Sequence, residues 1–215
     1  MFTLQESDSA ILPENVRIRW LSHPITQIFM ALLPKIDING SSKIVVKLGP
    51  RGEEDLFDNV LGVTNIFIED FDFKGFLSLD RFTQNTKLLD ELGNALITIA
   101  TKKVENKEVI SVINSTRNAV KKTQFQLTTQ IKKLSKISKD KKQKINVFRL
   151  LSPEVGESWY CETTNSQNST EKKIWMNDIP SFIDRSDYFK SAEIKDNIYF
   201  VKNRLGKIVF EMPLS

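Results

Sequence analysis

The residues that could perform catalysis are few in this chain. It holds one histidine, His23, and one cysteine, Cys161, among 215 residues. Histidine can serve as a base or a metal ligand near neutral pH, but His23 directly precedes Pro24, and we interpret it as structural. Zinc sites need several Cys and His ligands at close spacing, so we expect no zinc site. Separation in sequence does not exclude a Cys–His nucleophile pair, although Cys161 lies in an apparent strand and is expected to be a buried thiol.

Carboxylates gather in a second segment, at Glu69, Asp70 and Asp72. The run from Asp70 resembles the opening of a calcium loop, but its fifth and twelfth positions are Lys74 and Arg81, where a cation needs oxygen ligands. We therefore expect carboxylates that face water, or alternatively an acidic contact patch for a partner. Since the chain also lacks a phosphate-binding glycine loop, we predict no cofactor, no metal and no enzymatic activity. An enzyme of unrecognised type, using Asp and Glu, stays open because clusters formed in space are invisible in sequence.

Positive charge is concentrated between residues 121 and 144. This segment holds nine lysines and one carboxylate, Asp140, a net +8, whereas the whole chain carries +4, which leaves about −4 for the rest. Lys139, Lys141 and Lys142 lie in its most polar part and could attract an acidic partner or a phosphate backbone. The lysine strip from Lys132 to Lys144 has no interleaved aromatic residues for base stacking, so we prefer a solvated hairpin edge and keep nucleic-acid binding as the alternative.

The elements that would position these residues are predicted from periodicity. Val16–Trp20 alternates apolar and basic residues like a strand, and a short helix is predicted from Pro24 to Leu33. The pair Asn39-Gly40 favours a β-hairpin that joins strands at 35–38 and 43–48. A strand over 65–73 is expected to follow.

Two helices form the middle of the chain in this interpretation. Helical spacing predicts one from about Leu79 to Ala100, with Ser78 or Asp80 as its N-cap, and a second over 107–120. Together they predict a helical hairpin, over about 80–120, across one sheet face.

The last third is predicted to be rich in β-strands. Alternation over 125–131 and 145–149 indicates a long hairpin tipped by lysines, and further pairs are expected near 159–161 with 174–176, around a polar segment 164–170, and 198–201 with 207–210. Trp159, Tyr160 and Trp175 are typical both of cores and of interfaces, and we prefer the core. The predicted fold is α+β, with mostly antiparallel sheets, in a single domain over 1–215 and a possible subdivision near 121–124.

Composition and length place the chain among intracellular globular proteins. One cysteine permits no internal disulfide, and the first eight residues resemble no secretory signal, so we expect a cytoplasmic location. The longest nearly apolar run, 25–33, is about half of the ~20 residues that cross a bilayer, and we expect no membrane association.

Part of the chain follows a family pattern. The motif Phe71-Asp72-Phe73 is followed by residues 76–80 (FLSLD), by a helix with leucines at 88, 89, 92 and 96, and by the lysine-bearing hairpin. Over about residues 65–150 this order resembles bacterial immunity proteins of polymorphic toxin systems. The resemblance implies a small, cytoplasmic, non-catalytic protein that binds and blocks a cognate toxin, with no site residue carried over because toxin contacts differ from pair to pair.

The charge of the chain departs from that pattern. Proteins of this kind that neutralise basic nucleases are often acidic, whereas this chain is basic overall. The resemblance therefore implies either that the acidic patch near Asp70 makes the contact or that the toxin is not a basic nuclease. Which partner is bound, and in which oligomeric state, the sequence leaves open.

Overall fold

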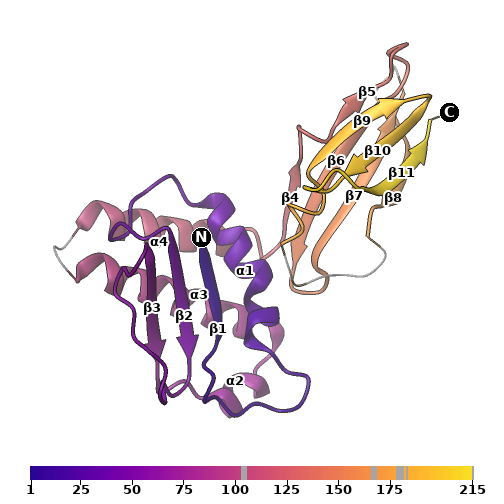
Figure 1. The fold of residues 1–215 in the computed structure, drawn as a ribbon. Coiled ribbons are helices and arrows are strands. Elements are labelled where there is room, and N and C mark those ends of the chain that lie inside the picture. The colour runs from indigo at the N-terminus through magenta and orange to yellow at the C-terminus, as the bar shows by residue number, and fades with distance from the viewer. Residues whose placement is uncertain (103–105, 166–168, 178–181, 183, 215) are drawn as a thin grey trace. The chain divides into compact units, whose positions relative to one another are not determined.

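The computed structural model describes residues 1–102, 106–165, 169–177, 182 and 184–214 (Figure 1). Their contacts divide the chain into two compact units. The N-terminal unit comprises Met1–Gln126 with Ser152–Glu154, and the C-terminal unit comprises Leu127–Leu151 with Val155–Ser215. The first boundary lies just after the segment 121–124, and whether the chain folds as one domain stays a prediction.

The N-terminal unit is built on a three-stranded sheet in the order β1-β2-β3. Its strands are β1 (Phe2–Glu6), β2 (Lys43–Leu48) and β3 (Val63–Ile68), and both pairings are parallel. The predicted hairpin over 35–48 is therefore wrong. Asn39 and Gly40 do adopt positive φ angles of 54° and 67°, but they turn the chain within the connection to β2, and residues 35–38 form no strand.

Helix α1 (Ile18–Leu32) connects the first two strands and packs on β1. It corrects two predictions, because residues 18–20 are helical and Pro24 lies inside the helix. The reason is the buried stripe of Ile18, Ser22, Ile25 and Phe29, whose spacing places them on one helical face. A five-residue alternation was too short to distinguish a strand from the first turn of this helix.

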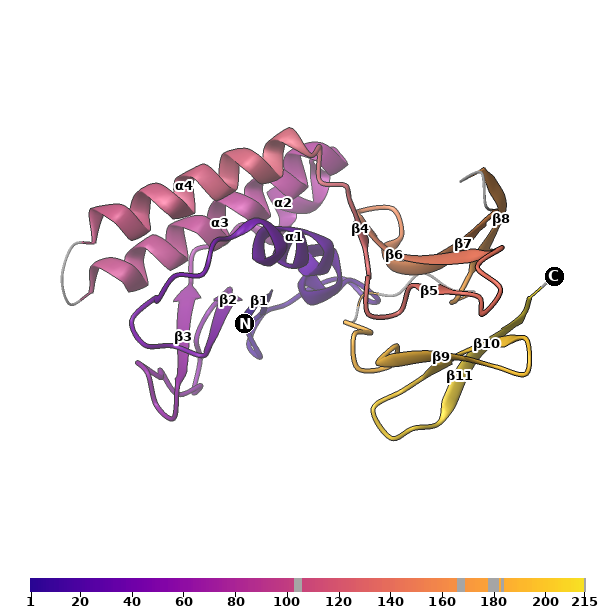
Figure 2. The same cartoon turned by 90° about the horizontal axis from the view of Figure 1, so that it is seen from above.

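The helical hairpin is confirmed. It consists of α3 (Arg81–Thr101) and α4 (Lys107–Lys122), which contact each other and α1. Asp80 caps α3 by accepting a hydrogen bond from the N–H of Thr83, and Asn106 caps α4 in the same way through Val109. Figure 2 shows α1, α3 and α4 on one side of the three-stranded sheet. The predicted strand over 65–73 is too long, since β3 ends at Ile68 and α2 (Phe73–Ser78) begins soon after.

The C-terminal unit is formed by two antiparallel sheets. One has the order β4-β6-β7-β8, with β5 paired to β6, and the other has the order β11-β10-β9. The strands of the first sheet are β4 (Leu127–Gln130), β5 (Lys136–Ile137), β6 (Lys144–Ser152), β7 (Gly156–Thr164) and β8 (Thr170–Trp175). Those of the second are β9 (Ser191–Lys195), β10 (Ile198–Lys202) and β11 (Ile208–Pro213).

Both sheets contribute to one core, which includes Val147, Trp159, Cys161 and Tyr199. The three predicted hairpins of this region are confirmed, as is the α+β fold class. Within the predicted polar segment 164–170, residues 166–168 lie outside the described part of the chain.

Candidate functional site

The predicted acidic patch lies at the end of β3. Glu69 and Asp70 are exposed in the turn that follows this strand. Asp72 is exposed as well, but its carboxylate accepts a 2.9 Å hydrogen bond from the N–H of Gly75 and caps α2. The carboxylate of Asp72 is therefore engaged in a helix cap. Within the described ranges, no group of three or more His, Cys, Asp or Glu residues is arranged to hold a metal ion.

The predicted lysines lie in the other unit, in the turn between β5 and β6. Lys139, Lys141 and Lys142 are all exposed there. Asp140 organises the turn, because its carboxylate accepts hydrogen bonds from Ser138 Oγ (2.6 Å) and from the N–H of Lys142 (3.1 Å). The same bonds, first that of Ser138, hold the pKa of Asp140 below its ordinary value. The structure therefore gathers the three lysines, and it places them on a different unit from Glu69 and Asp70.

The two groups with possible nucleophilic or basic chemistry also fall in different units. Cys161 is fully buried in β7, and burial raises the pKa of its thiol to about 11. The thiol is therefore protonated near neutral pH, where the thiolate is the nucleophile. His23 is 8% exposed, and its backbone carbonyl accepts a hydrogen bond from Thr26 Oγ1.

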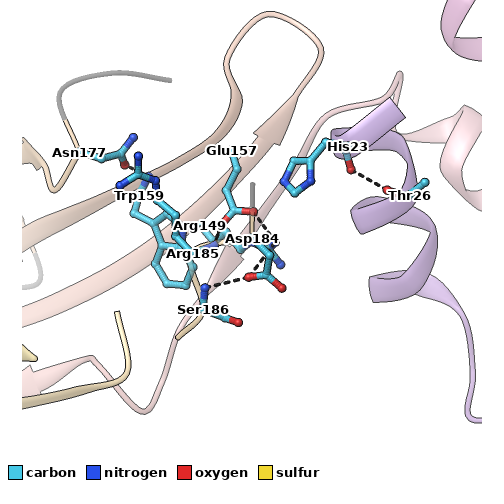
Figure 3. Close-up of polar contacts among 9 residues, drawn as sticks. All are labelled: His23, Thr26, Arg149, Glu157, Trp159, Asn177, Asp184, Arg185 and Ser186. Carbon is cyan, nitrogen blue, oxygen red and sulfur yellow. Dashed lines mark hydrogen bonds and ion pairs between the residues drawn. The ribbon is translucent and has the colours of Figure 1, made fainter. Parts of the chain in front are cut away.

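A buried carboxylate at the start of β7 was not recognised in the sequence. Glu157 is fully buried, and its oxygens accept hydrogen bonds from Trp159 Nε1 (2.7 Å), Arg149 Nη2 (2.5 Å) and the N–H of Arg185 (2.9 Å) (Figure 3). Arg149 also lies 3.8 Å from Asp184. The carboxylate of Glu157 is thus paired with an arginine, an indole and a backbone donor, and it links β7 to Arg149 of β6 and to the backbone at Arg185. We therefore interpret Glu157 as structural.

The three aromatic residues that we predicted to lie in the core, Trp159, Tyr160 and Trp175, differ in burial. Trp159 is 1% exposed and belongs to the core of the C-terminal unit, as expected. Tyr160 is buried as well, at 8% exposed. Trp175 is different, since 45% of it is exposed at the end of β8.

The most exposed apolar cluster of the N-terminal unit lies in the connection between β2 and β3. Four of its side chains are large, apolar and exposed, at Leu56 (54%), Phe57 (38%), Val60 (50%) and Leu61 (98%). We refer to residues 56–61 as the apolar loop. Single exposed apolar residues are ordinary on protein surfaces, but four within six consecutive residues make this connection a candidate interaction site.

Buried and half-buried asparagines hold the apolar loop in place. Asn65 in β3 is 4% exposed, and its side-chain oxygen accepts a hydrogen bond from the N–H of Phe57 while its side-chain amide donates to the carbonyl of Asp55 at 2.8 Å. Asn59 donates to the carbonyl of Asn39 at 2.8 Å, and its N–H donates to Thr64 Oγ1. The backbone of Val60 exchanges two hydrogen bonds with Val63. The loop is therefore fixed at several points along its length.

The loop also stores backbone strain and carries negative charge. Leu61 has a φ of 52°, a region that branched and bulky residues seldom adopt. Asp55 and Asp58 are exposed within or beside the loop, and Asp58 lies 3.8 Å from Lys102 Nζ. A leucine that is 98% exposed buries almost none of its side chain within the chain, so its strained backbone is not repaid by packing. Sequence reasoning missed this loop because exposure inside an aperiodic segment leaves no periodic pattern; the only available signal was four apolar residues within a connection.

Comparisons with protein-family models, with curated proteins and with solved structures found no match. No helix among the described residues is long and apolar enough to cross a membrane.

Proposed function

We propose that this chain is a non-catalytic protein-binding protein, an immunity-type inhibitor that neutralises a cognate bacterial toxin by direct contact. The observation that carries the binding role is the apolar loop, residues 56–61, with its exposed and strained Leu61. The resemblance of residues 65–150 to immunity proteins is the reason for choosing a toxin as the partner. A cytoplasmic location belongs to the same proposal.

The energetics of the loop support a docking role. Fully burying a leucine, valine or phenylalanine side chain contributes about 1.5–3 kcal/mol, so Leu61 alone could account for a tenfold or larger change in affinity. Because Asn65 and Asn59 already hold the backbone, little conformational entropy is lost when a partner closes over the loop.

The charges around the loop define the partner further. Asp55 and Asp58 flank the apolar side chains, and the N-terminal unit has 15 Lys and Arg against 17 Asp and Glu, a net charge of −2. A partner surface with an apolar pocket and a basic rim complements this arrangement. Glu69 and Asp70, at the opposite end of β3, remain predicted contacts of the same partner.

The test uses the C-terminal domain of a secreted toxin encoded next to the gene for this chain. Binding is measured by calorimetry with the wild type and with Leu61→Asn, because asparagine tolerates positive φ better than leucine and so preserves the loop. We expect the variant to bind at least tenfold more weakly. The matched control is Leu205→Asn in the C-terminal unit, where Leu205 is 91% exposed.

Two results would contradict the proposal. Absence of a complex between the wild type and the toxin domain at micromolar concentration would remove the inhibitor function. A complex that Leu61→Asn and Leu205→Asn weaken equally would show that the apolar loop is not the docking surface. Rescue of toxin-expressing cells by the wild type, lost with Leu61→Asn, is the corresponding expectation in vivo.

A further inference from the structure

The first sheet of the C-terminal unit carries a row of aromatic side chains on its outer face. The rings of Phe148 in β6 and Tyr160 in β7 stack with centroids 5.2 Å apart, and Tyr160 meets Trp175 in β8 edge to face, also at 5.2 Å. Their strand neighbours Val147 and Trp159 are buried in the core between the two sheets. Since side chains alternate along a strand, the aromatic row occupies the opposite face. Tyr160 is buried there, at 8% exposed, and Trp175, at 45%, is the member of the row that is open to a ligand.

A lysine is held against this row. The Nζ atom of Lys173 lies 4.0 Å from the ring centroid of Tyr160 and 4.8 Å from that of Trp175. The strand register places Lys173 opposite Glu162, and Lys173 is exposed. Cation–π attraction therefore keeps a positive charge beside an exposed indole. A base that stacks on an aromatic ring and a phosphate that pairs with a cation need these two groups side by side.

The turn between β5 and β6, which carries Lys139, Lys141 and Lys142, belongs to the same sheet. Lys144 is four residues before Phe148 in β6, which puts both side chains on one face about 13 Å apart along the strand. Between them lies Asn146, whose side-chain oxygen accepts a 2.9 Å hydrogen bond from Gln130 of β4. Lys139, Lys141 and Lys142 directly precede this strand. The strands therefore supply the aromatic groups that the lysine strip 132–144 lacks in sequence.

The charge of the whole unit agrees with an anionic ligand. The C-terminal unit has 16 Lys and Arg against 10 Asp and Glu, a net charge of +6, while the N-terminal unit carries −2. We propose that the outer face of this sheet binds single-stranded nucleic acid, with a base stacked on Trp175 and backbone phosphates paired with Lys173 and with the lysines of the turn. An acidic polypeptide would pair with the lysines, but it gives no role to the exposed indole.

The experiment measures the fluorescence anisotropy of a labelled oligothymidylate of about twelve nucleotides, a length within the range that single-strand binding folds cover. We expect micromolar binding at about 50 mM salt that weakens steeply as salt rises. Trp175→Ala should weaken binding by about tenfold, because loss of one stacked base costs roughly that factor. Lys173→Glu should weaken binding as well, because it replaces a cation that pairs with a phosphate by a carboxylate that repels it. Changing Lys139, Lys141 and Lys142 to Glu should make the fall of log affinity with log salt shallower, by about 0.7 in slope for each phosphate contact that is lost.

The control is Trp20→Ala, because Trp20 is 48% exposed and lies in α1 of the other unit. Thermal unfolding of every variant establishes that each is folded. Absence of binding by the wild type at low salt overturns the proposal, as does binding that Trp175→Ala and Lys173→Glu leave unchanged. Polyglutamate is the second ligand: if it binds in a Trp175-dependent way while the oligonucleotide does not, the ligand is an acidic polypeptide and the proposal fails. None of these results depends on the toxin.

Discussion

Arg117 of α4 and Asp90 of α3 form the polar link of the helical hairpin, with 2.7 Å between Arg117 Nη2 and Asp90 Oδ1. Lys121 Nζ lies 3.1 Å from the same oxygen, one helical turn further along α4. Arg117 reaches Asp90 by crossing α3 at Gly93, where a Cβ atom would lie 2.4 Å from Arg117 Cδ. Because Gly93 has no side chain, it leaves room for Arg117 to reach Asp90 and hold the two helices in register.

Gly93→Ala tests this arrangement. In an ordinary helix interior the change should stabilise by about 1 kcal/mol. Here we expect that gain to be cancelled, because the new methyl group displaces Arg117 from Asp90. In the background of Arg117→Ala the same change should recover the stabilisation. Urea unfolding of the wild type, the two single variants and the double variant measures the coupling free energy between Gly93 and Arg117. Additive effects would show that Gly93 and Arg117 are not coupled.

The Asp90 carboxylate predicts a dependence of stability on pH. Burial acts to raise its pKa, but hydrogen bonds from Arg117 and Lys121 outweigh burial and lower it. A carboxyl group with a lowered pKa in the folded state stabilises above its unfolded pKa of about 4, and this stabilisation is lost as the pH falls through the folded pKa. Asp90→Asn should therefore destabilise by up to about 1 kcal/mol near pH 7 and by less near pH 3. An equal effect at both pH values would contradict the ion pair.

Glu157 should be among the most sensitive positions of the C-terminal unit. Glu157→Ala removes a fully buried carboxylate from Arg149, Trp159 and Arg185, and breaking a buried pair from one side costs about 3–5 kcal/mol. Glu157→Gln keeps an acceptor for the indole but not the charge, so we expect a smaller loss. Denaturant unfolding monitored by tryptophan fluorescence distinguishes the two variants. Equal stability of Glu157→Ala and the wild type would show that the cluster contributes little.

Cys161 should be inert in the folded chain. Its thiol is fully buried with a pKa raised to about 11, so thiolate is scarce at moderately alkaline pH. A thiol reagent such as 5,5′-dithiobis(2-nitrobenzoate) should react only at the rate at which the C-terminal unit opens, and addition of urea should accelerate the reaction. Rapid labelling without denaturant would contradict the packing of β7.

Sequence predicted those elements whose partners are close along the chain. The periodicity of α3 and α4 extends over several turns, and Asp80 was one of the two caps predicted for the first helix, so local physics was sufficient. Antiparallel strands joined by short connections were found for the same reason. The parallel sheet was missed because β2 pairs with β1, some forty residues earlier, and no local pattern records that pairing.

The candidate sites show the same limit. Charge runs are visible in sequence, so Glu69, Asp70 and the lysines at 139, 141 and 142 were expected to be exposed, and they are. Leu61 and Trp175 are apolar, and sequence assigns such residues to the core unless the fold is known. Their exposure depends on where β3 and β8 lie within their sheets, which tertiary packing decides.

Asn65 provides the most direct test of the apolar loop. Asn65→Ala removes the acceptor for the N–H of Phe57 and the donor to the carbonyl of Asp55, and the loss of these two part-buried hydrogen bonds should cost about 0.5–1.5 kcal/mol each. We expect faster hydrogen exchange at the amide of Phe57, with exchange in α3 and α4 unchanged. Asn65→Asp keeps the acceptor but not the donor, so Phe57 should stay protected while the bond to Asp55 is lost. If the amide of Phe57 exchanges in Asn65→Ala as slowly as in the wild type, other contacts hold the loop. The affinity for the toxin domain can also be compared between Asn65→Ala and Leu61→Asn. The first variant reports the contribution of preorganisation, and the second reports that of direct contact.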